Sequence, residues 1–259
     1  MTSAPAARSW PILLLVFLLH AAIVHAVFFP SLHEIGTWDE SVYINEGRRL
    51  AEGALPRFSL NPAVAALYAL TYVPFASSAF WLVHSASLAR FLLFGLLWLA
   101  GALVARRLVG LASPLVMVAL VAMSPALVGL LNNGSNALFA AMSAFALWQC
   151  LAFHATRKPR HLWLCSLFLG AAALSRNEGP VLFPTFLVLV AVMEMRSRTI
   201  RASLAAAVIP FVALVGGYVL LYGLQTGSFA LGIRERSYIT FEQGHGMAFA
   251  SSYGSLQAY

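Results

Sequence analysis

The chain alternates long apolar segments with short polar connections, and most of these connections contain arginine or lysine. A membrane-spanning helix needs about 20 predominantly apolar residues, and several of the segments reach or approach that length. The pattern therefore predicts an all-α polytopic membrane protein with about seven transmembrane helices. The expected spans lie at about 10–29, 88–105, 113–131, 136–156, 161–175, 179–195 and 203–224. We expect the first to be an uncleaved anchor; the alternative is a signal peptide with a small-residue cleavage pattern at Val24-His25-Ala26.

Residues 61–83 form an apolar segment that does not fit this pattern as a span, because Pro62 and Pro74 interrupt it. Cytoplasmic loops of membrane proteins have an excess of basic residues, which decides how to place the segment. If it lies at the outer interface as one or two short helices, nine basic residues fall inside: Arg8, Arg106, Arg107, Arg157, Lys158, Arg160, Arg196, Arg198 and Arg201. If it crosses the membrane, all of these except Arg8 fall outside. We therefore expect interfacial helices here, a cytoplasmic N-terminus and an external C-terminus.

The composition agrees with one membrane domain over residues 1–259, with an external loop at 31–87 and an external polar tail at 225–259. Of the 259 residues, 61% are hydrophobic and 10% are charged, against about 25% charged in soluble domains, which excludes a soluble globular protein. The net charge of +7 is explained by the inner-side basic residues, so no nucleic-acid partner is predicted. Fifteen arginines to one lysine is typical of a GC-rich bacterial genome, so we expect an integral protein of a bacterial plasma membrane.

The acidic residues concentrate in the first external loop, where Asp39 is the only aspartate of the chain. One interpretation is structural: Thr37 and Glu40 match a capping box, and Gly53 is typical of a helix end, so the segment is a capped surface helix. The other is functional, since Asp39 and Glu40 at the outer interface could take a proton from an acceptor hydroxyl. The residues alone leave both interpretations open.

Basic and polar residues near this loop are further candidates. Arg48 and Arg49 either bind an anionic head group or extend toward lipid phosphates. Asn61 is expected to cap a helix that has Pro62 in its first turn. The aromatic apolar stretch that follows either guides a lipid tail or fills the helix bundle.

The external turn Ser175-Arg176-Asn177-Glu178-Gly179 joins two expected spans. Charged residues at the membrane boundary are costly unless they are paired or used. Arg176 therefore either pairs with Glu178 or faces a phosphate group. The seven histidines and the two cysteines, Cys150 and Cys165, make no metal-binding motif. No specific cofactor is therefore predicted, and a divalent metal stays an open alternative that no residue pattern supports.

The order of these segments resembles the C-type membrane glycosyltransferases (GT-C), closest to the branch of protein mannosyltransferases and lipid A aminoarabinose transferases. The resemblance covers about residues 10 to 225 and rests on short motifs in sequence order. They are Trp38-Asp39-Glu40 with Tyr43 and Gly53; Asn61-Pro62; a span ending Ala105-Arg106-Arg107-Leu108-Val109-Gly110; Ser124-Pro125; and Leu174-Ser175-Arg176-Asn177-Glu178-Gly179-Pro180.

The resemblance implies an active site on the outer face and a sugar donor linked to polyprenyl phosphate within the membrane lipid. Asp39 takes the position of the family's key acid, with Glu40 beside it, and a basic residue often matches Arg176. Arg176, Arg48 and Arg49 are the donor-phosphate candidates, and Tyr43, Asn61 and Glu178 are expected to support the site. The chain also has no Gly-rich nucleotide loop, which agrees with a lipid-linked donor.

Two alternatives stay open. One is a multi-span transporter or flippase for a lipid-linked or small solute, although the expected spans are nearly free of polar residues, Gln149 being the main exception. The other is a non-catalytic relative. Typical members of the resembled family are considerably longer, with more spans, so we expect this chain to correspond to the N-terminal part of such a protein.

Overall fold

The computed structural model describes residues 14–15, 17–19, 22, 38–54, 61–109, 134–176, 179–195, 199–227 and 229. All regular secondary structure in this part of the chain is helical, as the sequence predicts. The helices are α2 (Trp38–Ala51), α3 (Pro62–Tyr72), α4 (Trp81–Val109), α7 (Gly134–Thr156), α8 (Pro159–Ala173), α9 (Leu182–Glu194), α10 (Ile200–Phe211) and α11 (Gly217–Thr226). Short 3-10 turns lie at Val73–Phe75 and Gly179–Val181.

Three helices are long and apolar enough to cross a membrane: Trp81–Leu108, Gly134–Thr156 and Ile200–Gln225. They correspond to three of the seven expected spans. Helices α8 and α9 occupy two more of the expected segments but are shorter, with 15 and 13 residues. The expected span at 113–131 and most of that at 10–29 lie outside the described residues.

The segment 61–83 forms short helices, as its prolines predict. Helix α3 begins at Pro62 and passes into the 3-10 turn Val73–Phe75, which contains Pro74. A turn over Ala76–Phe80 then separates it from α4. Proline lacks an amide hydrogen and clashes with the preceding helical turn, which explains why no single long helix forms here. Helix α4 begins at Trp81, seven residues before the expected start of the next span at 88.

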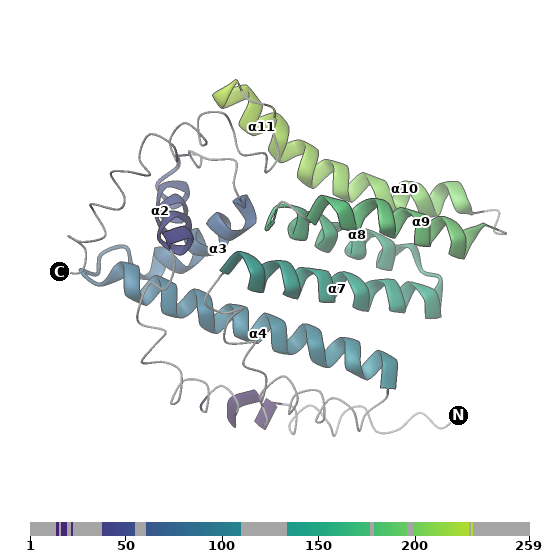
Figure 1. The fold of residues 1–259 in the computed structure, drawn as a ribbon, viewed down its shortest axis with the longest axis horizontal. Helices are drawn as coiled ribbons and strands as arrows, with labels where there is room; N and C mark the ends of the chain where they lie inside the picture. The colour runs from purple at the N-terminus through teal and green to yellow at the C-terminus, as the bar shows by residue number, and fades with distance from the viewer. Residues whose placement is uncertain are drawn as a thin grey trace.

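The longer helices lie side by side in a bundle, and α2 and α3 cross one end of it (Figure 1). One apolar core joins α2, α3, α4 and α7, and includes the fully buried Ile44, Tyr68 and Leu93. A second core joins α7 to α8, α9 and α10 around Phe153 and Leu162. Helix α7 contributes to both cores and so connects the crossing helices to the rest of the bundle.

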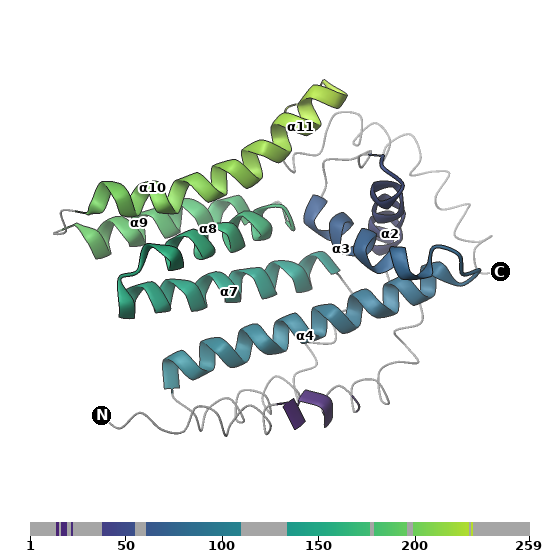
Figure 2. The same ribbon diagram turned by 180° about the vertical axis from the view of Figure 1, so that it is seen from behind.

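The view from behind shows that the two ends of the bundle differ (Figure 2). One end holds α2, α3 and the connection from α8 to α9. The other holds the end of α4 and the connections from α7 to α8 and from α9 to α10. All described members of the predicted inner-side basic set lie at or next to this second end: Arg106, Arg107, Arg157, Lys158, Arg160 and Arg201. The first end is called the α2–α3 end below, and the second is called the basic end.

The last long helix continues through Pro210 by forming a π turn at Val212–Gly216 between α10 and α11. Ser166 of α8 enters the backbone ladder at this point. Its hydroxyl donates to the carbonyl of Ala207 and accepts from the amide of Phe211 at 3.1 Å. A side chain that inserts in this way replaces a direct helical hydrogen bond and permits a bend. Ser166 thereby joins α8 to α10 at the irregular turn.

Candidate functional site

The predicted catalytic acids lie at the start of α2. The helix begins at Trp38, so the backbone of Asp39 and Glu40 forms its first turn. The side chains of both residues, and all of Thr37, lie outside the described part of the structure, so the capping box stays a prediction. Negative charge in a first helical turn is favoured by the helix dipole.

Helix α2 is packed against α3 and is not simply a surface helix, which corrects the structural interpretation of this segment. Tyr43, Ile44 and Glu46 are buried, and α3 leaves no room for a side chain at Gly47. A Cβ atom on Gly47 would lie 2.5 Å from Cβ of Tyr68 and 2.8 Å from the amide nitrogen of Ala69. Gly47 therefore allows the two helices to approach closely, and this contact fixes where the first turn of α2 lies.

The end of α2 confirms the prediction made from Gly53. Its φ angle of 85° is in the left-handed region, where glycine is favoured. The amide of Gly53 donates to the carbonyl of Leu50 at 3.1 Å, and the amide of Ala54 donates to that of Arg49 at 2.8 Å. These two bonds form a Schellman motif, which satisfies carbonyls at the helix end.

Arg48 and Arg49 both have partners within the protein. Arg49 lies 3.8 Å from the buried Glu46, and Arg48 lies 3.8 Å from Glu52. The guanidinium of Arg48 also lies 5.6 Å from the ring centroid of Trp81 in α4. These contacts hold both side chains beside α2. Binding of a donor phosphate by either arginine stays a prediction.

Asn61 precedes α3, with Pro62 at its first position as predicted, but its side chain does not cap the helix. Its φ and ψ angles are 50° and 54°, in the left-handed region, whereas a capping side chain works from an extended backbone. The amide of Asn61 instead donates a hydrogen bond to the hydroxyl of Tyr43 in α2. The structure therefore brings together two of the three predicted supporting residues and corrects the capping role of Asn61.

The turn that contains Arg176 is joined directly to the start of α3. The amide of Ala63, which has no partner within α3, donates to the carbonyl of Leu174 at 3.1 Å. Ser175 is buried and donates from its hydroxyl to the carbonyl of Ala171 at 2.6 Å. The amide of Arg176 donates to the carbonyl of Ala172 at 3.2 Å. These bonds fix the backbone of the turn beside Asn61-Pro62.

Gly179 closes the described part of this turn. Its amide donates to the carbonyl of Arg176 at 3.0 Å, and an added Cβ atom would lie 2.5 Å from the carbonyl oxygen of Ala172. The side chain of Arg176 is half-buried. Asn177 and Glu178 lie outside the described residues, so pairing between Arg176 and Glu178 stays a prediction.

These contacts make a continuous connection between three segments that are far apart in the sequence. Helix α2 meets α3 through Tyr43 and Asn61, and α3 meets the α8 end through Ala63 and Leu174. Val215 of the π turn and Tyr218 of α11 pack beside Leu174. The α2–α3 end thus holds the backbone of Asp39, the Tyr43–Asn61 hydrogen bond and Arg176. A tyrosine hydroxyl and an arginine guanidinium in one region suit hydrogen bonding and binding of an anion.

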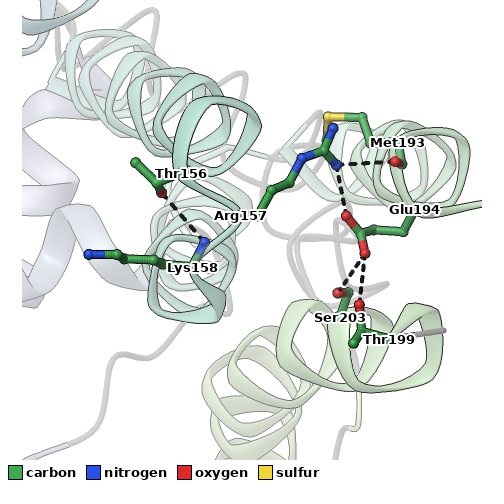
Figure 3. Close-up of polar contacts among 7 residues, drawn as sticks. All are labelled: Thr156, Arg157, Lys158, Met193, Glu194, Thr199 and Ser203. Carbon is green, nitrogen blue, oxygen red and sulfur yellow. Dashed lines mark hydrogen bonds and ion pairs between the residues drawn. The ribbon is translucent and has the colours of Figure 1, made fainter. Parts of the chain in front are cut away.

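Sequence reasoning missed a second polar network, which lies at the basic end (Figure 3). Arg157 donates to Glu194 at 2.7 Å and to the carbonyl of Met193 at 3.1 Å. Thr199 and Ser203 donate to the other carboxylate oxygen of Glu194 at 3.1 and 3.4 Å. The network joins the α7–α8 connection to the end of α9 and the start of α10. The signal in the sequence was Glu194 itself, an isolated acid at the end of an apolar run.

The described residues contain no group of three or more His, Cys, Asp or Glu side chains that could hold a metal ion. Comparison of the chain with protein-family models, with curated proteins and with solved structures finds no match. The arrangement of the α2–α3 end is therefore the principal guide to function.

Proposed function

We propose that this chain is a GT-C-type glycosyltransferase, or the N-terminal part of one, whose reaction takes place at the α2–α3 end. One observation supports the proposal most directly. A hydrogen-bonded connection links the helix that contains Asp39 to Asn61-Pro62 and then to the turn that contains Arg176. The three motifs of the resemblance that fall in this part of the chain therefore meet at one place, although more than 130 residues separate Asp39 from Arg176.

In the proposed reaction, the donor is a sugar attached to polyprenyl phosphate. Asp39 takes the proton of an acceptor hydroxyl or amine as that group attacks the anomeric carbon. A new bond forms from the acceptor to this carbon, and the bond to the phosphate oxygen breaks, with inversion. The lipid phosphate leaves with the bonding electron pair, and the proton remains on Asp39 until solvent removes it. Glu40 supports Asp39 as a second carboxylate.

Arg176 would stabilise the charge that develops on the leaving phosphate, with Arg48 or Arg49 as a further cation. Arg176 is the strongest of the three candidates, because ion pairs on α2 already engage Arg48 and Arg49. Tyr43 and Asn61 join α2, which contains Asp39, to the start of α3. No resident metal is needed for this scheme.

The proposed topology has seven spans, with the basic end in the cytoplasm and the α2–α3 end outside a bacterial plasma membrane. Six described basic residues lie at or next to the basic end, and this grouping supports the topology, since basic residues favour the cytoplasmic side. A donor linked to a lipid suits the outer face, where no pool of nucleotide sugars exists.

The test is transfer of radiolabelled sugar in membranes that contain the full chain. The two probe donors are polyprenyl-phosphate mannose and polyprenyl-phosphate aminoarabinose, and the readout is label in membrane acceptors. Loss of a general base lowers rates by about 10²–10⁴-fold, so Asp39→Asn should show that loss for the donor that wild type uses. Glu52→Gln, which changes an exposed acid of the same segment, should transfer within about twofold of wild type.

Near-normal transfer by a well-expressed Asp39→Asn variant would refute the role of Asp39. Absence of transfer by wild type from both donors would refute the assignment to this branch. Arg176→Gln should lower transfer more than Arg48→Gln does. The opposite order would exclude Arg176 as the principal phosphate-binding residue.

A transporter or flippase is the second candidate, and one observation favours it. The buried polar side chains of the apolar helices include Arg90 of α4 and Gln149 of α7, which are 4% and 3% exposed. Polar residues at such depth often mark a transport path. Gln149, however, lies 2.7 Å from His161 of α8, which is the pattern of a helix–helix hydrogen bond. Movement of a fluorescent lipid-linked sugar across vesicles, unchanged by Asp39→Asn, would favour this alternative.

A further inference from the structure

The basic end contains a cavity of about 370 Å³ between α4 and α7. Its described lining is Leu103, Arg106 and Arg107 of α4 and Trp148 of α7. Ligand sites in proteins start at about 300 Å³, so the volume is sufficient for a head group. This cavity lies at the opposite end of the bundle from Asp39 and Arg176 and has no part in the proposed transfer reaction.

The described residues around the cavity make it positive. The chain has no acidic residue between Glu52 and Glu178, so α4, α7 and α8 contain no carboxylate. The nearest acid along the chain at the basic end, Glu194, is already bound by Arg157, Thr199 and Ser203. A helix C-terminus has only about half a negative charge, which two arginines in the last turn of α4 exceed. The cavity therefore suits an anion.

Basic residues at the start of α8 add to this charge. Lys158 and Arg160 lie at the same end of the bundle as Arg106 and Arg107, which are in the last turn of α4.

An apolar track leads to the arginines along one face of α4. Leu92, Leu99 and Leu103 recur at spacings of seven and four residues and continue to Arg106, which places them on one side of the helix. Leu92 and Leu99 are exposed on the described surface, as is Leu147, next to Trp148 on α7. Tryptophan is enriched where membrane helices meet the head-group layer. A ligand that fits both the arginine-lined cavity and the apolar face of α4 has an anionic head group and an apolar chain.

We propose that this cavity binds the phosphate of an anionic phospholipid at Arg106 and Arg107, with the acyl chains along the Leu92–Leu99–Leu103 face of α4. Basic pockets between transmembrane helices on the cytoplasmic side are suited to such head groups. Arginine binds phosphate oxygens through two parallel N–H donors. Binding at Arg106 and Arg107 would therefore be more specific than attraction to a general positive surface charge. Trp148 covers the boundary between the head group and the chains.

The test uses tryptophan fluorescence of the purified full chain in nanodiscs. Brominated phosphatidylglycerol or brominated phosphatidylcholine is titrated into a phosphatidylcholine background, because bromine quenches tryptophan at short range. The signal lost between wild type and Trp148→Phe is the contribution of Trp148. Brominated phosphatidylglycerol should quench this contribution at a mole fraction on the order of tenfold lower than brominated phosphatidylcholine, given two basic residues near the head group.

In the double variant Arg106→Gln with Arg107→Gln, the mole fraction of brominated phosphatidylglycerol that quenches Trp148 should rise to the value for brominated phosphatidylcholine. The pair Arg106→Lys with Arg107→Lys should keep part of the preference and controls for folding. Arg201→Gln changes a basic residue at the same end of the bundle that does not line the cavity, and it should quench as wild type does. Size-exclusion profiles of all variants check that they remain folded.

Equal quenching of Trp148 by the two lipids would overturn the proposal, as would an unchanged preference in the double glutamine variant. Inorganic phosphate in millimolar excess distinguishes the source of the phosphate group. The salt response of the Arg201→Gln variant is the control for this addition. If phosphate abolishes the preference of wild type for phosphatidylglycerol and the control is unchanged, the site binds free phosphate and the lipid assignment is wrong. If the preference persists, the ligand is the lipid. Neither result depends on sugar transfer.

Discussion

Asn61 donates a hydrogen bond from its side-chain amide to the hydroxyl of Tyr43, and so joins the start of α3 to the middle of α2. The two residues lie on opposite sides of the α2–α3 connection. Because Ala63, two residues later, donates to the carbonyl of Leu174, the Asn61 segment is held from both sides. A substitution at Asn61 should therefore change the relative positions of Asp39 and Arg176.

The first prediction concerns the left-handed backbone of Asn61. Asn61→Gly removes the hydrogen bond to Tyr43 but accepts the φ angle of 50°. Asn61→Ala removes the same bond and adds the cost of a left-handed residue with a Cβ atom, about 1–2 kcal/mol. We expect the alanine variant to unfold at a lower temperature in detergent than the glycine variant. Tyr43→Phe should match the glycine variant, and equal stability of the alanine and glycine variants would contradict the argument.

The second prediction concerns the close contact between α2 and α3. A methyl group at Gly47 would lie 2.5 Å from Cβ of Tyr68, so Gly47→Ala should push α2 away and destabilise the protein by about 1–3 kcal/mol. It should also lower sugar transfer, since α2 contains Asp39. Gly101→Ala is the control, because its added methyl has nothing within 4 Å among the described neighbours in α4. Alanine is favoured over glycine within a helix, so this variant should be as stable as wild type or slightly more so.

The helical class, the end of α2 at Gly53 and the short helices at 61–83 could be predicted because each depends on local chemistry. Runs of apolar residues, a glycine at a left-handed position and prolines act within a few residues of themselves. The contact of Gly47 with Tyr68 depends on tertiary packing, so nothing near Gly47 in sequence indicated it. The same holds for the bond from Ala63 to Leu174, which uses only backbone atoms and leaves no trace in residue identity.

The capping role of Asn61 was wrong for a related reason. The Asn-Pro pair correctly indicates where a helix starts, but either an extended or a left-handed asparagine can precede it. Contact with Tyr43 selects the second, and that contact is 18 residues away. The basic clusters, in contrast, predict only the topology. Their charge pattern could not show that Arg157 binds Glu194, because this requires α8 and α9 to lie antiparallel.

The third prediction concerns Ser166 at the π turn. Ser166→Ala would leave the carbonyl of Ala207 and the amide of Phe211 without the hydroxyl that serves both. Buried polar groups without partners cost about 1–3 kcal/mol, so we expect a clear drop in thermal stability. Ser143→Ala is the matched control, because the buried Ser143 hydroxyl has no hydrogen-bond partner in the described part of the chain. If the two variants lose equal stability, the bridging role of Ser166 is excluded.

The fourth prediction concerns the carboxylate of Glu194. Glu194 is 5% exposed and accepts hydrogen bonds from Arg157 of the α7–α8 connection, from Thr199 of the α9–α10 connection and from Ser203 near the start of α10. Glu194→Ala removes the shared acceptor and leaves these donors without it, so we expect a loss of about 1–3 kcal/mol in stability. Glu194→Gln keeps one acceptor oxygen and should lose less.

Glu52→Ala is the exposed counterpart for this comparison. Its pair with Arg48 has an N–O distance of 3.8 Å, and the two side chains are 40% and 50% exposed. Exposed ion pairs contribute about 0–1 kcal/mol, so this variant should unfold close to wild type. The measurement is the midpoint of thermal unfolding in one detergent for all four proteins, with wild type as reference. Because the donors to Glu194 join the α7–α8 connection to the start of α10, a Glu194→Ala variant as stable as Glu52→Ala would mean that packing of α8, α9 and α10 holds the basic end together without the polar network.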